Sequence, residues 1–326
     1  MVYQGRIAGN NRAPSLKASG PASGSSERQR SRGPEGRGRG ADPDQGEGRQ
    51  RHPGRGPGRL TVASLGPGFP EYIIPQARAD LDAAQVVAGY RTYIDLLAPV
   101  LTHQEVVATG MKAEVKRCQA AIDRALEGQR VALVSSGDAG IYGMAGLVLE
   151  ICAARELKVG PPQGSKEVDF YLEMIPGVPA LAAAAALLGA PLMHDFAAIS
   201  LSDLLTPWEI IQKRVELAAE GDLVIVLYNP KSKKRDWQLG AVRDLLLKVK
   251  DRATPVGIVS RAMREGQEVV VTTLEEMLDH PVDMQTVVIV GNSQTFAYGQ
   301  YMITPRGYLK KYQVTEELTE ETGQKV

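Results

Sequence analysis

The stretch Arg130-Val-Ala-Leu-Val-Ser-Ser-Gly-Asp-Ala-Gly-Ile-Tyr-Gly143 decides the fold, because an apolar run ends abruptly in two glycines and an aspartate. A short continuous apolar run predicts a strand that is buried on both faces, and the glycines predict a tight turn after it. The stretch Leu60-Thr-Val-Ala-Ser-Leu-Gly-Pro-Gly68 has the same form. Strands of this kind are typical of parallel sheets that are covered by helices on both sides.

The rest of the chain alternates apolar strand patterns with helical spacing, which predicts an α/β fold with a mainly parallel first sheet. In the first half we expect strands at 60–65, 82–88, 105–109, 130–135 and 168–174, and helices from 75, at 112–127 and at 141–155. In the second half we expect helices at 178–189, 207–219, 235–249 and 274–278, and strands at 197–201, 223–228, 255–261, 268–273 and 286–290. The short connection 262–267 predicts a hairpin, so the second sheet should be mixed.

Four segments are expected: an Arg/Gly-rich tail at 1–59, an α/β domain at 60–175, a second α/β domain at 176–310 and a polar tail at 311–326. The first segment has 13 Gly, 11 Arg and 6 Pro, which favours disorder. It carries a net charge of about +7, so the remainder is acidic, and the folded part lacks the basic surface of a nucleic-acid-binding domain. An irrelevant extension explains the tail better than RNA contact does.

The sequence also argues against metal sites, disulfides and membrane or secretory segments. Cys118 and Cys152 fit no zinc, iron–sulfur or disulfide spacing, and both are expected to be buried thiols in a cytoplasmic protein. His103, His194 and His280 are scattered, so no metal site is expected. No apolar run is long enough for a transmembrane helix, and residues 1–30 show no secretory signal.

Ligands of open α/β sheets bind beyond the carboxyl ends of the strands, so the loops there are the candidate site. Gly66-Pro-Gly68 can bring backbone close to a ligand or simply form a tight turn. Asp138 can serve a ligand or cap the following helix. Asn229, before Pro230, can present an amide to a ligand or begin a turn.

Taken together, these loops resemble the tetrapyrrole methyltransferases, over roughly residues 60–310. The resemblance is strongest to the precorrin-3B and cobalt-factor III C17-methyltransferases. It is carried by Gly89-Tyr-Arg-Thr-Tyr-Ile-Asp95, Thr109-Gly-Met111, Ser135-Ser-Gly-Asp-Ala-Gly-Ile-Tyr-Gly-Met-Ala145, Ile199-Ser-Leu-Ser-Asp-Leu-Leu-Thr-Pro-Trp208, Tyr228-Asn-Pro-Lys-Ser232 and Val290-Gly-Asn-Ser-Gln-Thr295. Three places depart from the family: Ser64 replaces a Gly, Ala139 replaces a Pro, and Ile73-Ile-Pro75 replaces a helix start that contains Thr.

The resemblance implies a two-domain homodimer that binds S-adenosylmethionine in the cleft between its domains and a tetrapyrrole at the mouth of that cleft. It implies that the cofactor-binding residues are Gly66, Pro67, Ser136, Gly137, Asp138, Ile141, Pro179, Ala180, Tyr228, Asn229 and Thr272. The reaction it implies is methylation at C17 with contraction of the ring, as a step of cobalamin synthesis. No metal is required for that chemistry.

Ring contraction needs a positioned acid or base, and the candidates are Asp203, Tyr142, Tyr90 and Ser202, with Tyr93 and Thr206 nearby in sequence. None is singled out, and Asp203 can equally cap a helix that starts near Pro207. The basic run Lys231, Lys233, Lys234 and Arg235 can bind substrate carboxylates or form a solvated turn, and the second interpretation is slightly favoured.

Three other functions remain open. A sister enzyme would methylate C11, C20, C2 or uroporphyrinogen; a binding module would hold S-adenosylmethionine or a tetrapyrrole without catalysis; an RNA-binding protein would use the Arg/Gly-rich tail. The sequence leaves undecided whether the substrate contains cobalt.

Overall fold

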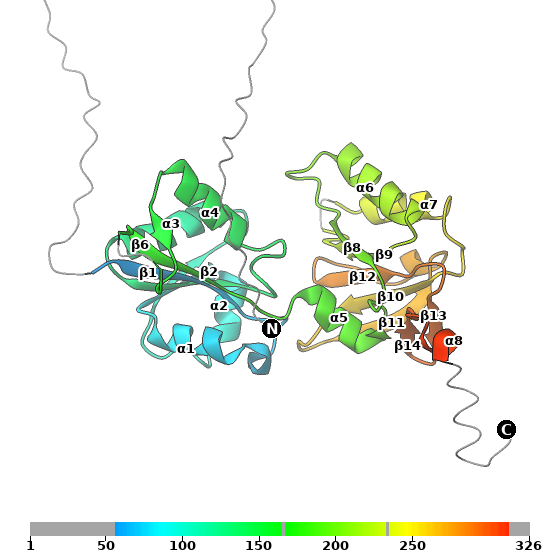
Figure 1. Ribbon diagram of the computed structural model, residues 1–326, viewed down its shortest axis with the longest axis horizontal. Coiled ribbons are helices and arrows are strands. Elements are labelled where there is room, and N and C mark those ends of the chain that lie inside the picture. Colours follow the sequence, from blue (N-terminus) through cyan, green and yellow to red (C-terminus); the bar gives the residue numbers. More distant parts are fainter. Residues whose placement is uncertain (1–55, 165–166, 233–234, 313–326) are drawn as a thin grey trace, which may run out of the picture. The chain divides into compact units, whose positions relative to one another are not determined.

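The computed structural model describes residues 56–164, 167–232 and 235–312 and contains two large sheets (Figure 1). The first sheet has six strands, all parallel, in the order β3-β2-β4-β1-β6-β5. Its strands are β1 (Gly58–Ser64), β2 (Val86–Tyr90), β3 (Glu105–Thr109), β4 (Arg130–Ser135), β5 (Val159–Gly160) and β6 (Phe170–Ile175). Because β1 and β4 are adjacent, the glycine loops that follow them leave the sheet side by side.

Helices cover both faces of this sheet, as its apolar strands require. One face packs on α1 (Pro75–Ala83), which follows the 3-10 turn η1 (Pro70–Tyr72), and on α2 (Arg91–Leu97). The other face packs on α3 (Glu114–Leu126) and α4 (Ala145–Ala154) (Figure 1). Cys118 and Cys152 lie buried in this second layer, as predicted.

The second sheet has five strands in the order β11-β10-β12-β9-β8. Its strands are β8 (Phe196–Ser200), β9 (Val224–Tyr228), β10 (Pro255–Ser260), β11 (Glu268–Thr273) and β12 (Thr286–Val290). Strands β8 and β9 are parallel, and β10 is antiparallel to both β11 and β12, which confirms the predicted mixed sheet.

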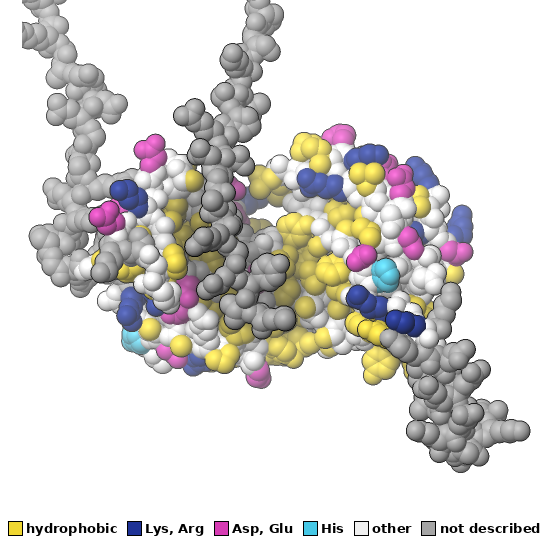
Figure 2. Space-filling model, viewed as in Figure 1, with side chains coloured by type: hydrophobic (Ala, Val, Ile, Leu, Met, Phe, Trp, Pro, Cys, Tyr) yellow, Lys and Arg dark blue, Asp and Glu magenta, His cyan; other side chains and the backbone are white. Residues whose placement is uncertain are grey.

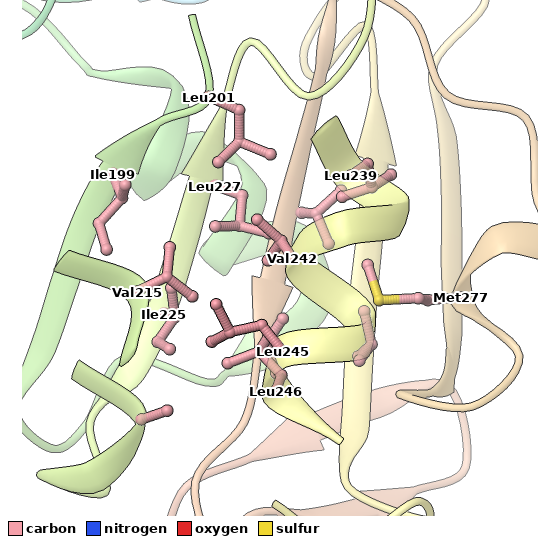
Figure 3. Packing of buried hydrophobic residues seen from close by; sticks show 14 of the residues in the cluster. Ile199, Leu201, Val215, Ile225, Leu227, Leu239, Val242, Leu245, Leu246 and Met277 are labelled. Atoms are coloured by element: carbon pink, nitrogen blue, oxygen red, sulfur yellow. The ribbon is translucent and has the colours of Figure 1, made fainter. Parts of the chain in front are cut away.

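Helices α6 (Trp208–Glu220) and α7 (Gln238–Leu246) cover one face of the second sheet, and α5 (Ala180–Leu188) covers the other. Helix α7 directs Leu239, Val242 and Leu246 toward the strands, where they meet Ile225 and Leu227 of β9 (Figure 3). All five side chains are at most 4% exposed. This packing holds the carboxyl end of β9, and therefore Tyr228 and Asn229, in a fixed place.

A small third sheet was not predicted. It has the order β13-β14-β7, from β7 (Gly189–Ala190), β13 (Phe296–Tyr298) and β14 (Tyr301–Ile303), and the short helix α8 (Tyr308–Tyr312) follows it. The strands are too short to leave a periodic pattern. Gly189, at φ +101, ends α5 and pairs with Met302.

Several predicted helices begin late, because residues with a left-handed backbone precede them. The helix predicted at 141–155 begins at Ala145, after Tyr142 at φ +55. The helix predicted at 112–127 begins at Glu114, after Lys112 at φ +65. The helix predicted at 274–278 is instead the 3-10 turn η2 (Met277–Asp279), and α2 was not predicted at all.

No helix among the described residues is long and apolar enough to cross a membrane. The predictions for most of the tail at 1–59, for Lys233 and Lys234, and for residues 313–326 lie outside the described part of the chain.

Candidate active site

The loops after β1 and β4 are joined backbone to backbone at their glycines. The amide of Gly66 donates to the carbonyl of Gly137 at 3.1 Å, and the amide of Gly137 donates back at 2.7 Å. Both glycines have left-handed backbones, at φ +72 and +66. A Cβ atom at Gly66 would lie 2.7 Å from the carbonyl oxygen of Tyr72, so this crossing requires glycine.

Asp138 ties these two loops to a third, the one after β6. Its Oδ1 accepts from the amide of Gly140 at 2.7 Å, and its Oδ2 accepts from the amide of Gly177 at 2.9 Å. The helix-cap interpretation is wrong, because α4 begins at Ala145 and Met144 is its N-cap. Asp138 therefore links the loop after β6 to the two glycine loops, which are already joined to each other.

Two departures from the family pattern touch one another. The hydroxyl of Ser64 accepts a hydrogen bond from the amide of Ala139 at 2.9 Å, and both residues are buried. Glycine at position 64 has no hydroxyl, and proline at position 139 has no N–H to donate. The two changes therefore form a compensating pair that closes the same loop.

On the second sheet, Tyr228 and Asn229 hold the loop after β9. The Tyr228 hydroxyl accepts from the amide of Leu181 at 2.9 Å, at the start of α5, where Pro179 and Ala180 also lie. Burial raises the pKa of Tyr228 to about 12. Asn229, at φ +52, donates through Nδ2 to the hydroxyl of Ser200 at 3.0 Å.

Tyr142 connects the loop after β4 to the second sheet. Its hydroxyl donates to the carbonyl of Ala198 at 2.9 Å, and its ring centroid lies 5.1 Å from that of Tyr228. Ile141 beside it is 37% exposed. The loops that contain Gly66, Asp138, Tyr142, Ala180 and Tyr228 are thus linked by a chain of direct contacts.

Thr272 lies apart from this chain of contacts. It is in β11, at the opposite edge of the second sheet from β8, and pairs with Val256. Its neighbour Val271 packs against the α5 side, so the Thr272 side chain points to the other face. Its role in cofactor binding stays a prediction.

Besides Tyr142, the acid–base candidates fall into two groups. Tyr90 and Tyr93 form an edge-to-face pair, with ring centroids 5.2 Å apart, beside the first sheet. Ser202, Asp203 and Thr206 lie in the loop after β8.

Asp203 does not cap a helix: Pro207 is the N-cap of α6, and no side chain caps it. Instead Asp203 accepts from Gln238 Nε2 at 3.0 Å and lies 3.8 Å from Arg235 Nε.

In the basic run after β9, Arg235 is buried, although a solvated turn was the favoured interpretation. Arg235 is only 6% exposed and donates to the carbonyls of Leu201 at 2.9 Å and Asn229 at 2.7 Å. It therefore joins the loops after β8 and β9 and is neither a solvated residue nor open to a substrate carboxylate. Lys231 is exposed.

Sequence reasoning missed Arg264, which lies in the connection between β10 and β11. Its guanidinium donates through Nε to the carbonyl of Pro67, and through Nη2 to the hydroxyl of Ser136 at 2.7 Å. A charged residue in a hairpin connection looks like an ordinary solvated one, so the sequence carried no signal. Arg264 thus binds both glycine loops from the second half of the chain.

Apolar side chains are exposed just beyond the carboxyl ends of several strands. Phe69, Met111 and Tyr142 are 43%, 59% and 54% exposed, and Leu204 and Leu205 after β8 are 74% and 98% exposed. Figure 2 shows hydrophobic side chains gathered in the middle of the face that is viewed, with charged ones mainly toward its edges. Exposed apolar groups next to backbone-lined loops suit a large, flat ligand.

Both cysteines are buried, free thiols, and burial raises the pKa of Cys118 to about 11 and also raises that of Cys152. Among the described residues, no three His, Cys, Asp or Glu side chains are grouped as metal ligands. His103 and His194 are exposed.

Comparison with known proteins relates this arrangement to one family. Residues 59–278 match the model of the tetrapyrrole (corrin/porphyrin) methylases. The chain is 49% identical over 249 residues to a probable cobalt-factor III C(17)-methyltransferase of Salmonella typhimurium, covering 76% of this chain and 99% of that protein. It is 48% identical over 259 residues to the cobalt-factor III methyltransferase of Priestia megaterium, covering 79% of this chain but only 47% of that longer protein.

Among solved structures, the crystal structure of the methyltransferase CobJ superposes with a TM-score of 0.68 at 36% identity, covering 76% of this chain and 100% of that one. Sequence, fold and loop geometry agree, and the chain belongs to the tetrapyrrole (corrin/porphyrin) methylases.

Proposed function

We propose that this protein transfers a methyl group from S-adenosylmethionine to C17 of cobalt-factor III or precorrin-3B, with ring contraction, in cobalamin synthesis. The observation that carries the proposal is the 49% identity to the Salmonella protein named for this reaction, over 99% of that protein's length. The full-length match matters because the chain spans only about half of the Priestia megaterium relative.

The loops fit the methyl donor. At Gly177 a Cβ atom would lie 2.5 Å from the carbonyl oxygen of Gly137, so backbone crosses backbone with no room for a side chain. We assign the methyl donor to the glycine cradle, which is formed by Gly66, Gly137 and Gly177, and to Tyr228 and Asn229 of the second sheet. The residues proposed to contact it are Gly66, Pro67, Ser136, Gly137, Asp138, Ile141, Pro179, Ala180, Tyr228, Asn229 and Thr272. When bound, S-adenosylmethionine supplies a methyl group on a sulfonium, which is a good leaving group.

The protein's own task is to orient the ring carbon and exclude water, and orientation of this kind contributes about 7–11 kcal/mol. The exposed apolar side chains Met111, Leu204 and Leu205 would cover the faces of the ring. Asp203 is held in place by Gln238 and Arg235, so it can accept a proton at a fixed position. Burial raises the pKa of Tyr142, which keeps its hydroxyl protonated as a donor. Tyr90 and Ser202 remain alternative proton carriers.

We also propose that residues 60–175 and 176–310 form two domains with the active site between them. Their cores support this, since one pair of apolar clusters draws mainly on strands β1–β6 and the other pair on strands β8–β12.

We infer that the enzyme is a cytoplasmic homodimer. Free, buried thiols are consistent with a reducing compartment. The aromatic side chains of Phe296, Tyr298 and Tyr301 are 46%, 70% and 44% exposed on β13 and β14, which supplies an apolar surface for a second copy. Light scattering on the full chain should give twice the monomer mass.

The function is tested by incubating the full chain with S-adenosylmethionine labelled with ¹³C in its methyl group, and with cobalt-factor III or precorrin-3B in separate anaerobic reactions. We expect the NMR spectrum of the product to show the label at C17 with one substrate. Label at C11, C20 or C2 would reassign the chain to a sister enzyme. Binding of both reactants without transfer would make it a binding module.

A further inference from the structure

Arg264 carries a partly buried positive charge with no acidic partner among the described residues. Its two acceptors, the Pro67 carbonyl and the Ser136 hydroxyl, are both neutral. Burial lowers the pKa of Arg264, because its surroundings partly desolvate the charge. A cation that is partly desolvated gains from an anionic partner, and the two neutral acceptors of Arg264 do not supply one.

A second guanidinium, which is fully buried, also acts on this region. Arg117 is 3% exposed, donates to Thr109 Oγ1 at 2.8 Å, and lies 5.9 Å from the centre of the Tyr90 ring. Within the described part of the chain it too forms no ion pair. Both arginines act electrostatically on Tyr93, and no carboxylate of the described residues offsets them there. This corner of the molecule therefore attracts anions.

The charge of Arg264 borders a small hollow. Its lining is apolar side chains and glycines, apart from Tyr93, Ser136 and Arg264. Only three of these side chains are polar, and they are a guanidinium and two hydroxyls. Tyr93 lies close enough to interact with the Ser136 hydroxyl, and burial raises the pKa of Tyr93, which keeps its proton in place.

The backbone is shaped to admit this arginine. A Cβ atom at Gly68 would lie 2.2 Å from Arg264 Cγ and 2.3 Å from the carbonyl oxygen of Met263. The amide of Phe69 donates to that same carbonyl at 2.9 Å. The β10–β11 connection is thus locked onto the Gly66–Gly68 loop, and the guanidinium is held in one position before any ligand arrives.

We propose that Arg264, together with the hydroxyls of Ser136 and Tyr93, forms a binding site for a carboxylate of one of the two reactants. This inference rests on the proposed function, in which both reactants carry carboxylates: the amino-acid part of the methyl donor, and the acetate and propionate arms of the tetrapyrrole. A carboxylate supplies the missing charge and accepts hydrogen bonds from a guanidinium and from hydroxyls.

The test uses Arg264→Gln in the full chain, which removes the charge and keeps most of the size. Arg261→Gln is the matched control, because Arg261 lies in the same connection, is exposed, and contacts Gln285 and Asp283 instead. Calorimetry measures the Kd of S-adenosylhomocysteine and of its decarboxylated analogue. Absorbance titration measures the Kd of cobalt-factor III. These are binding measurements, so they stand even where methyl transfer, and with it the proposed function, fails.

If the methyl donor supplies the carboxylate, Arg264→Gln raises the Kd of S-adenosylhomocysteine at least about tenfold and leaves the Kd of the decarboxylated analogue unchanged. If the tetrapyrrole supplies it, only the Kd of cobalt-factor III rises, by a similar factor. The proposal is overturned if all three Kd values stay within about twofold of the wild-type values. It is also overturned if the Kd of the decarboxylated analogue rises as much as that of S-adenosylhomocysteine, because Arg264 would then be a structural link only.

Should Arg264→Gln fail to fold, Arg264→Lys keeps the charge but loses the planar, two-pronged donor. In addition, if the donor supplies the carboxylate, the wild-type protein must bind S-adenosylhomocysteine more tightly than its decarboxylated analogue. Equal affinity leaves the tetrapyrrole as the only source, and an unchanged cobalt-factor III Kd in Arg264→Lys would then contradict the proposal.

Discussion

The loops of the two large sheets are held together in different ways. Beyond the first sheet, Gly66, Gly137 and Gly177 meet through backbone, and the Asp138 carboxylate accepts from backbone amides. Beyond the second sheet, side chains make the links: Arg235 bonds two loop carbonyls, and Asn229 bonds Ser200. The first arrangement leaves no room for a side chain, whereas the second depends on the hydrogen bonds of one buried cation.

This difference fits a division of work. A backbone cradle approaches a ligand closely and does not vary with side-chain rotamers, which suits a cofactor of constant structure. Loops joined by side chains can carry exposed apolar residues such as Leu204 and Leu205, which suits recognition of a large substrate. Each arrangement can therefore be broken by a different kind of substitution.

The largest effect is expected from Arg235→Met, because the buried Leu201 carbonyl and the partly buried Asn229 carbonyl lose their donor. Each unsatisfied group costs about 1–3 kcal/mol, so the free energy of unfolding should fall by about 3 kcal/mol. Hydrogen exchange should increase at 199–206 and 229–232 but not at Gly66 or Gly137. Arg252→Met is the control: this side chain pairs with Glu275 at the surface, and its loss should cost under about 1 kcal/mol. If both variants lower the free energy of unfolding equally, Arg235 does not hold the two loops together.

Gly177→Ala tests the backbone cradle. The added Cβ must displace the Gly137 carbonyl and the Ser64 side chain, each 2.5 Å away, which should cost about 1–3 kcal/mol and weaken S-adenosylhomocysteine binding at least about tenfold. Gly146→Ala, in an open position of α4, should instead stabilise the protein by about 0.5–1 kcal/mol. Calorimetry and urea denaturation report both quantities, and an unchanged Kd in Gly177→Ala would refute the cradle.

Tyr228 predicts a dependence of stability on alkaline pH. Burial raises its pKa to about 12 in the folded protein, above its ordinary value of 10.0. The unfolded chain therefore loses this proton first, so the stabilisation is complete below pH 10 and is lost as pH rises from about 10 to 12.

Tyr228→Phe should lower stability by about 1 kcal/mol at neutral pH, since Leu181 loses its acceptor, and should make the alkaline decline shallower. Urea midpoints measured across this pH range check both effects. An identical decline in the variant would show that Tyr228 does not have the raised pKa.

The smallest expected effect is at the start of α1. Ile74 is the N-cap and makes no side-chain hydrogen bond to the helix. Ile74→Thr restores a capping hydroxyl, and we expect a gain of about 0.5 kcal/mol after the lost apolar contact is offset. Thermal denaturation measures it. A decrease in stability would mean that Ile74 contributes more by packing than a cap returns.

The strands were predictable because they are buried on both faces. The apolar runs of β9 and β12 agree with prediction within one residue at each end. Helix starts were less predictable, since Lys112 and Tyr142 adopt left-handed backbones that no periodicity reveals. For the candidate site, the family resemblance predicted that the glycine loops and Tyr228 bind the cofactor, which stays a prediction, and the structure shows that these loops are in contact. It could not show the hydrogen-bond partners of Arg235 or Arg264, because these come from distant parts of the chain.

A crystal structure of the full chain with S-adenosylhomocysteine would show directly which of the two sets of loops contacts the ligand. We predict the ligand against the backbone of Gly66, Gly137 and Asp138, with Tyr228 and Asn229 on its other side. A ligand bound elsewhere, with these five residues free of contact, would contradict the division of work between the two sets of loops.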